Sequence, residues 1–119
     1  MGLKVTSGGA YTVTTVLINA AKNDTRVLVA TPGAGYALYV LGMSFGSDAD
    51  GTATFRDDTP TNHSGAVPLL VDGSNNVVWP TAAHPDYAWI KCAEDTALEV
   101  ILSVDSDLDG VLIYATVAV

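Results

Sequence analysis

Hydrophobic and polar residues alternate along much of the chain, which is the pattern of half-buried β-strands. Residues 98–105 (LEVILSVD) place four aliphatic side chains on one face and mostly polar ones on the other. Residues 52–56 alternate in the same way and direct Ala53 and Phe55 inward. No stretch has the 3.6-residue period of an amphipathic helix. The pattern therefore predicts strands throughout.

Two longer runs are apolar on both faces, namely residues 36–45 (YALYVLGMSF) and 111–119 (VLIYATVAV). We expect both to be central strands, because only a strand covered on both sides can bury such a run. Clusters of Gly, Pro, Asn and Asp separate the expected strands at intervals of about eight to twelve residues, which is typical of a sandwich or barrel. The remaining expected strands are 12–20, 26–30, 67–71, 77–79 and 87–92.

These patterns predict an all-β protein, with a single antiparallel β-sandwich of eight to nine short strands. The absence of crossover helices makes the sheets antiparallel. The expected domain spans residues 11–119, and residues 1–10, with their Ser-Gly-Gly sequence, are expected to be a flexible arm. The predicted core is Leu38, Val40, Phe55, Leu69, Ile90, Leu98, Val100, Leu102 and Ile113.

The net charge of the chain limits the kinds of molecule that it is expected to bind. The 119 residues include thirteen acidic and five basic side chains, for a net charge of −8, and 49% are hydrophobic. An acidic surface repels phosphate, so we expect no nucleic acid partner, and the same charge argues against a polybasic membrane contact. No apolar run approaches the roughly 20 residues of a membrane span, and residues 1–15 lack the apolar region of a secretory signal. We expect a soluble protein made in a cytoplasm.

The sequence Ser-Asp-x-Asp-Gly occurs twice, at residues 47–51 and 106–110, each time after an apolar strand. Asp-Gly suits tight hairpins, which need positive φ angles, so we expect two hairpin turns and no metal. A calcium site formed by Asp105, Asp107 and Asp109 is the alternative. An EF-hand is excluded, because its twelfth position requires Glu and is Thr116 here.

Candidate catalytic chemistry is sparse. His63 and His84 are the only histidines, and we expect both to be solvated loop residues. Cys92, the only cysteine, rules out an internal disulfide and is expected to be a small buried apolar side chain. Phosphate-binding glycine motifs and a nucleophile elbow are absent from the sequence. We expect no enzymatic activity and no cofactor.

The aromatic residues suggest a binding surface. In the expected strand 87–92, Tyr87 and Trp89 share a face with Lys91, and lysine is seldom buried. Exposed aromatic rings are enriched at binding sites, where they stack on sugars or bury against a subunit. The alternative is that a loop covers both rings. The candidate interface residues are Tyr87, Trp89, Trp79, Lys91, Lys4 and Tyr11.

Several short motifs occur in a familiar order. They are residues 35–42 (GYALYVLG), 51–55 (GTATF), 64–69 (SGAVPL), 76–80 (NVVWP), an aromatic, acidic-turn, Ala-Leu element at 89–100, and 110–114 (GVLIY). Together they resemble small virion proteins of tailed bacteriophages, of the capsid decoration (cement) type. The resemblance covers about residues 25–119, and residues 1–24 match no pattern.

The resemblance implies a jelly-roll-like sandwich and a homotrimer on the outer face of an assembled capsid. The implied partner is the major capsid protein, and the implied location is the virion surface, after synthesis in the host cytoplasm. Such a structural protein would stabilise the shell by binding it. The rival interpretation is a carbohydrate- or receptor-binding β-sandwich module, calcium-dependent if the acidic loops hold the ion.

Overall fold

The computed structural model describes residues 11–20, 25–71, 73–77, 85–104 and 106–119. Their regular elements are strands and one short 3₁₀ helix, η2 (Pro85–Tyr87). This part of the chain contains no helix that is long and apolar enough to cross a membrane. The predicted all-β class is confirmed. The expected arm, residues 1–10, lies outside the described residues.

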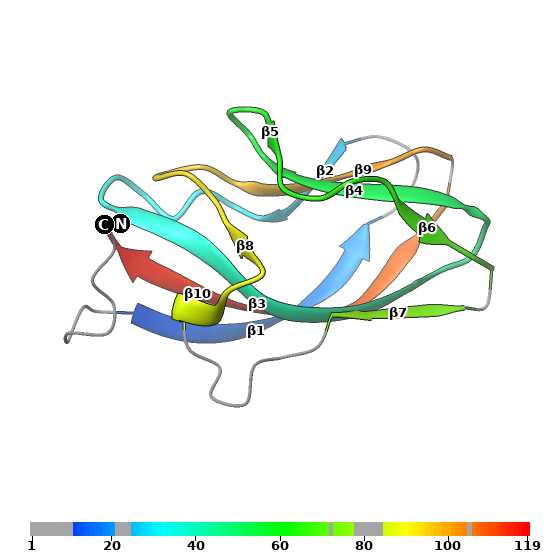
Figure 1. Cartoon of the computed structure of the whole chain (residues 1–119), viewed down its shortest axis with the longest axis horizontal. Coiled ribbons are helices and arrows are strands. Elements are labelled where there is room, and N and C mark those ends of the chain that lie inside the picture. Colours follow the sequence, from blue (N-terminus) through cyan, green and yellow to red (C-terminus); the bar gives the residue numbers. More distant parts are fainter. Residues whose placement is uncertain (1–10, 21–24, 72, 78–84, 105) are drawn as a thin grey trace.

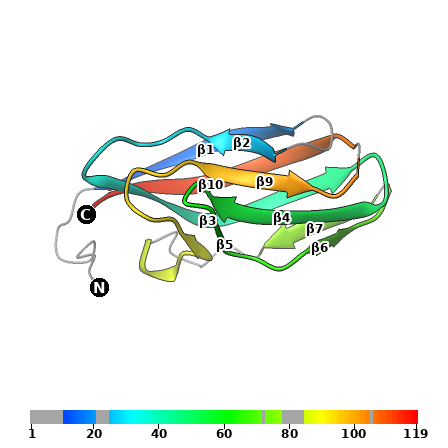
Figure 2. The ribbon, with the colours of Figure 1, turned by 90° about the horizontal axis from the view of Figure 1, so that it is seen from above.

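The strands form two antiparallel five-stranded sheets that pack face to face (Figures 1 and 2). Sheet A contains, in order, β1 (Tyr11–Ala20), β10 (Leu108–Ala118), β3 (Tyr36–Ser47) and β7 (Ser74–Val77), with β8 (Ile90–Lys91) also on β3. Sheet B contains, in order, β2 (Thr25–Val29), β9 (Leu98–Leu102), β4 (Gly51–Asp57) and β5 (Thr61–Asn62), with β6 (Val67–Leu69) also on β4.

The strand pairs are nested along the chain. β1 pairs with β10, β2 with β9, β3 with β7 and β4 with β6. The chain is thus a long folded ribbon that is rolled up, and the β10–β3 and β9–β4 pairs close each sheet. A double-sheet roll of this kind is the jelly roll. The expectation of a jelly-roll-like antiparallel sandwich is therefore confirmed.

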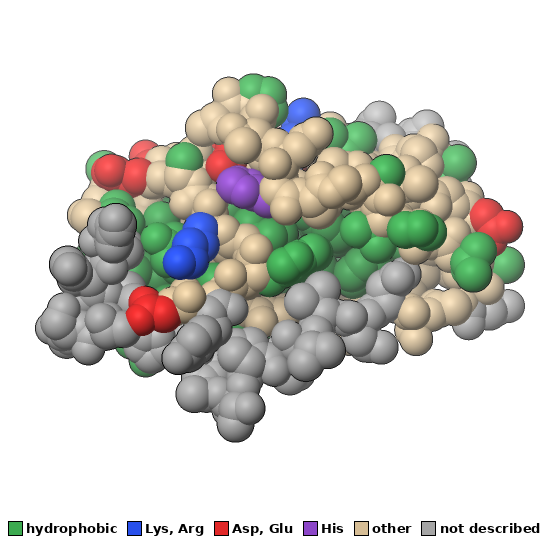
Figure 3. All heavy atoms as spheres, in the orientation of Figure 1, with side chains coloured by type: hydrophobic (Ala, Val, Ile, Leu, Met, Phe, Trp, Pro, Cys, Tyr) green, Lys and Arg blue, Asp and Glu red, His purple; other side chains and the backbone are tan. Residues whose placement is uncertain are grey.

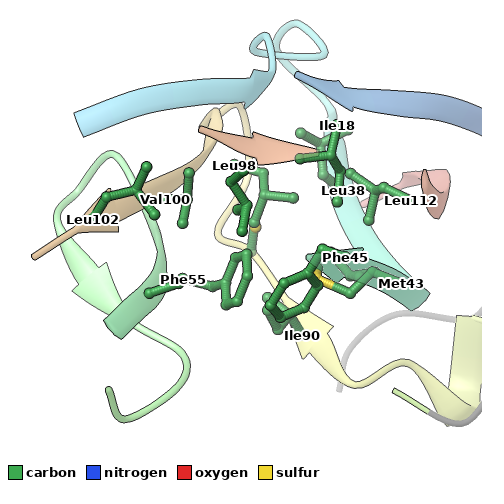
Figure 4. Packing of buried hydrophobic residues seen from close by; sticks show 14 of the residues in the cluster. Ile18, Leu38, Met43, Phe45, Phe55, Ile90, Leu98, Val100, Leu102 and Leu112 are labelled. Atoms are coloured by element: carbon green, nitrogen blue, oxygen red, sulfur yellow. The ribbon is translucent and has the colours of Figure 1, made fainter. Parts of the chain in front are cut away.

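The core lies between the sheets and follows the predicted alternation (Figure 4). In β9, Leu98, Val100 and Leu102 are buried, and in β4 Ala53 and Phe55 are buried. Every residue of the predicted core except Ile113 belongs to this cluster. Ile113 instead lies in a second cluster, which is described below, because its position in β10 faces away from sheet B.

A β-bulge explains why β3 is apolar on both faces. The register with β10 shifts between Ile113 and Tyr114, so that Gly42 and Val40 pair with them and Leu41 is the extra residue. The bulge reverses the phase of alternation. Core-facing positions before the bulge have even numbers (38 and 40), and those after it have odd numbers (43 and 45).

The prediction of one strand over residues 87–92 is wrong in part. The segment begins in η2, bends, and is a strand only in β8. It still runs beside β3, since Trp89 N donates to Val40 O at 2.8 Å and Cys92 N donates to Leu38 O at 3.0 Å. The bend at Trp89 breaks the alternation that the prediction assumed.

Candidate functional site

The outer face of sheet A, turned away from sheet B, is apolar. A second buried cluster lies there, and Ile113 and Ala88 pack against it. In β10, whose neighbours are β1 and β3, the outward positions alternate with the core-facing ones. Sandwich faces that meet only water are normally polar. The members of this cluster are Ala37, Tyr39, Leu41, Ala115 and Val117.

Charge is almost absent from this part of the sandwich. β1 and β3 contain no charged residue, and β10 contains only Asp109. The acidic residues that give the chain its net charge of −8 therefore lie elsewhere. Asp109 is exposed and occupies an outward position of β10, so this face is poor in charge but not free of it. The cluster residues are at most 9% exposed, so they are buried within the chain, and only the margin of the face at β1 is open to another apolar surface.

The apolar face reaches solvent at β1. Val16 and Ile18 face the core, so the odd-numbered residues of β1 face outward. Leu17 is 78% exposed, Val13 44% and Tyr11 38%. We call Tyr11, Val13 and Leu17 the β1 apolar row. Tyr11 was a predicted interface candidate, and the structure places it at one end of this row.

Lys91 lies at the other side of the same face. It is exposed, as predicted, and its Nζ lies 5.4 Å from the centre of the Tyr39 ring, its partner across the β3–β8 pair. Burial, with a smaller effect from the negative charge of Asp86, raises the pKa of the Tyr39 hydroxyl. The Lys91 ammonium group therefore lies within cation–π distance of the Tyr39 ring.

Trp89 does not share the face of Lys91. Its ring packs at an edge-to-face angle of 65° on Phe55, at 5.8 Å between centroids, on the core side. It remains 37% exposed, so it is a surface ring that closes one edge of the core. Figure 3 shows a band of hydrophobic side chains across the face in view. Leu70 and Val71, which follow β6 in the chain, are exposed as well.

The other predicted interface residues are not placed by the structure. Trp79 and Lys4 lie outside the described residues, and for Tyr87 only the backbone, in η2, is described. The structure therefore does not bring the three aromatic candidates together or separate them. Their shared role stays a prediction.

Asp57 and His63 form a buried acid–histidine pair that the sequence analysis missed. Asp57 Oδ2 lies 2.8 Å from His63 Nε2 and accepts a hydrogen bond from Ala93 N at 3.2 Å. Its Oδ1 accepts from Thr59 N, Thr61 N and the Thr59 hydroxyl. The carboxylate therefore joins the β4–β5 turn to the segment that follows β8.

Hydrogen bonds decide the ionisation of Asp57. Burial by itself raises the pKa of the carboxyl, but the hydrogen bonds from Thr59, His63 and Ala93 outweigh it and lower the pKa well below its ordinary value. The expectation that His63 is a solvated loop residue is wrong, because its side chain is only 20% exposed and binds Asp57. His84 lies outside the described residues.

Ser64, the residue after His63, does not present its hydroxyl to the Asp57–His63 pair as a nucleophile. The Ser64 hydroxyl accepts a hydrogen bond from Phe55 N and donates one to Gly65 O. Cys92 is buried, as predicted, and burial, with help from the negative charges of Asp57 and Asp58, raises the pKa of its thiol to about 12. A thiol with so high a pKa is a poor nucleophile near neutral pH.

The two Ser-Asp-x-Asp-Gly segments are not hairpin turns. The first joins β3 of sheet A to β4 of sheet B, and the second joins β9 of sheet B to β10 of sheet A. They lie side by side at one end of the sandwich, where Asp48 Oδ1 accepts from Asp107 N at 2.8 Å. Asp50 Oδ1 likewise accepts from Val71 N at 2.8 Å. Both carboxylates hold connections between sheets.

The glycines of these segments also differ from expectation. Among the described residues positive φ angles occur at Gly33, Gly35 and Asp95, and not at Gly51 or Gly110. Gly110 lies inside β10, opposite Phe45 of β3. The sequence motif predicts a glycine in a tight turn. Gly110 is needed instead because β10 and β3 lie very close together at this position.

The described residues do not supply a set of ligands for the alternative interpretation, a calcium site. They contain no group of three or more His, Cys, Asp or Glu side chains placed to hold a metal ion. Asp109 is exposed on β10 and Asp107 is partly buried in the connection before it. Asp105 lies outside the described residues, so the three-carboxylate site stays untested.

One signal in the sequence could have located Asp57. The inward phase of β4 runs through Ala53 and Phe55, and the next inward position is 57. A carboxylate in a core-facing position must have hydrogen-bond donors nearby. Thr59, Thr61 and His63 follow at once in the sequence and supply them.

Comparisons with known proteins gave no match. No family model matches the chain, and no curated protein or solved structure matches it.

Proposed function

We propose that this chain is a structural virion protein of the capsid decoration type, which binds the outside of an assembled phage shell and stabilises it. The observation that carries the proposal is the exposed β1 apolar row, with Leu17 78% and Val13 44% exposed, on a strand that carries no charge. Jelly rolls are common in viral structural proteins, and the motif resemblance points the same way. The partners would be the major capsid protein and other copies of the chain, in the trimer that the resemblance implies.

The polar groups of the described residues support a structural role. Asp57 uses both carboxylate oxygens to fix the turn after β4, and Asp48 and Asp50 fix connections at the end of the sandwich. Gly33 N and Gly35 N are held in the same way by Asp95 and Glu94. Carboxylates thus serve as acceptors for backbone N–H groups, which rigidifies the loops of a binding module.

The mechanism would be stabilisation by linkage. A protein that binds the assembled shell and not free capsid subunits stabilises the shell by mass action. Copies that bridge neighbouring subunits add avidity, because each second contact is intramolecular. The net charge of −8 would keep decorated particles apart in solution.

The direct test uses empty shells built from the major capsid protein of the virus that encodes the chain. The protein should co-sediment with these shells, and not with the unassembled capsid protein, and it should raise the temperature at which the shells disassemble. Equal binding to unassembled subunits, or no binding to either, would contradict the proposal.

Trp89→Ala tests the aromatic part of that contact. If Trp89 buries against a subunit or the shell, its removal should weaken assembly by about 2 kcal/mol or more, a loss of roughly thirtyfold in affinity. Val27→Ala, at an exposed apolar position on β2 of sheet B, is the matched control and should cost far less. The unfolding temperature of each variant must be measured too, because Trp89 also packs on Phe55. A folded Trp89→Ala that binds shells unchanged would remove this residue from the interface.

A carbohydrate- or receptor-binding module is the second candidate, and the partial exposure of Trp89 is the observation in its favour. A ring that is 37% exposed at an edge of the sandwich could stack on a sugar. A saturable change of tryptophan fluorescence on titration with glycans, lost in Trp89→Ala, would favour this function over capsid decoration.

A further inference from the structure

β1 is the edge strand of sheet A and has none of the features that normally protect an edge. It pairs in unbroken register with β10 on one side, and it lies at the end of the strand order that the described residues form (Figure 2). Natural edge strands are usually short, bulged, or guarded by charge or proline. β1 spans Tyr11–Ala20, with the sequence YTVTTVLINA, and has no bulge, charge, proline or glycine.

We propose that β1 pairs antiparallel with β1 of a second copy of this chain, about a two-fold axis at Thr15, and so continues sheet A across both copies. The proposal concerns two copies in solution and does not depend on the capsid interpretation. A strand that adds to an open edge gains main-chain hydrogen bonds as well as side-chain contacts.

Charge limits where a second copy can bind. Two molecules that each carry −8 repel one another over most of their surfaces. β1 itself carries no charge, and on the neighbouring strand Asp109 lies opposite Asn19, near one end of β1, so two copies can approach along most of β1 without opposing carboxylates. A basic partner, which the net charge would attract, would find no carboxylate on β1 to pair with.

The register follows from two constraints. First, outward-facing side chains of one copy must lie beside outward-facing side chains of the other. Second, only every other residue of β1 directs its N–H and C=O groups toward the open edge, and these groups must pair with the same kind of residue in the second copy. Both constraints require partners whose residue numbers are both odd or both even. An axis at Thr15 satisfies them and places Val13 opposite Leu17 of the other copy and Tyr11 opposite Asn19.

That register is also the one that covers exposed apolar surface. Leu17 and Val13, which are 78% and 44% exposed, would each lie beside an aliphatic side chain of the other copy. Cross-strand aliphatic and β-branched pairs stabilise antiparallel sheets. On the core side, Val16 would lie opposite Thr14 and Ile18 opposite Thr12. The β1 apolar rows of the two copies would become one continuous strip.

Cysteine cross-linking tests both the contact and the register. Thr15 is exposed and would lie opposite itself, so Thr15→Cys in a Cys92→Ala background should be joined into covalent dimers by oxidation or a short bis-thiol reagent. The matched control is Val27→Cys in the same background, since Val27 is 58% exposed on β2, the edge strand of sheet B. Thr15→Cys should cross-link at least tenfold faster. Equal or slower cross-linking would overturn the proposal.

A second variant distinguishes pairing through β1 from cross-linking that results from random collision. Leu17→Asp should fold, because the side chain is largely exposed, and it should raise the dimer dissociation constant at least tenfold in sedimentation experiments. An unchanged constant would overturn the proposal. Residues 1–10 are the rival occupant of the edge. A wild-type chain that is monomeric, and that dimerises only when residues 1–10 are removed, would also overturn it.

Discussion

Gly110 shows how closely two backbones approach in this fold. A Cβ atom at this position would lie 1.9 Å from Ser44 O and 2.7 Å from Phe45 Cα, both backbone atoms of β3. Neither neighbour can move without breaking the pairing of β10 with β3, which joins the two halves of sheet A. Only the absence of a side chain permits this contact. The glycine of a turn-like motif is thus a packing requirement.

Gly110→Ala should therefore destabilise the protein by about 2 kcal/mol or more, as overpacked sites do. Gly65→Ala is the control, because nothing lies within 4 Å of a Cβ atom at that exposed position. Urea unfolding of the two variants gives the comparison. Equal stability of both variants would show that the strands separate more easily than the geometry indicates.

Asp57→Asn tests the buried carboxylate. Loss of the charge weakens the hydrogen bonds from Thr59, Thr61, Ala93 and His63, and we expect a loss of about 2 kcal/mol at pH 7. Asp50→Asn is a control, since Asp50 is exposed and accepts one described hydrogen bond.

The same residue predicts a pH dependence. The pKa of Asp57 is lower in the folded state than in the unfolded state, where it is about 4. Its contribution is therefore complete above about pH 4 and is lost as the pH falls from there toward the folded-state value. Wild-type stability should decline in this range, and the decline should be smaller in Asp57→Asn. Parallel stability–pH curves for the two proteins would contradict this assignment.

At the scale of elements, alternation in the sequence predicted β4 and β9 because each has one buried and one partly exposed face. β3 and β10 were recognised as central strands because both their faces are apolar. Alternation could not reveal the bulge at Leu41, since the phase change is hidden in a run that is apolar on both faces. It also could not predict that residues 87–92 bend, because the hydrogen bonds that fix Trp89 come from β3, far away in the sequence.

The candidate site was predicted less well than the fold. Exposure of Lys91 and burial of Cys92 follow from residue type, and both predictions are confirmed. The two acidic motifs were interpreted locally as hairpins, whereas they connect different sheets. Their role depends on the neighbouring connection, as the bond from Asp107 N to Asp48 shows, and no local pattern encodes that neighbour.

Deleting Leu41 tests the bulge. Without the extra residue β3 would alternate regularly, so Leu38, Val40, Met43 and Phe45 could all face the core and pair with β10 without a register shift. We expect the deletion variant to unfold cooperatively, measured by circular dichroism, with a loss of stability similar to that of Leu41→Ala, about 2–5 kcal/mol. A deletion variant that loses cooperative unfolding while Leu41→Ala retains it would show that the fold requires the bulge itself.

At the scale of the whole molecule, charge and hydrophobicity are separated in space. A net charge of −8 coexists with β1 and β3, which carry no charge, and with a buried apolar cluster on the outer face of sheet A. That cluster is buried within the chain, but the β1 apolar row is exposed, and an isolated sandwich would gain solubility from polar residues in that row. The arrangement is explained if the protein works in contact with copies of itself or with a larger assembly, which is the central claim of the proposed function.

Sedimentation equilibrium of the purified wild-type chain, with and without a calcium chelator, tests that claim most directly. The account predicts a stable oligomer whose mass is a multiple of 12.3 kDa and does not change with the chelator. A dimer would agree with pairing through β1, a trimer would agree with capsid decoration alone, and an assembly of six chains would agree with both. A chain that remains monomeric at all concentrations, or an oligomer that dissociates with the chelator, would contradict the account.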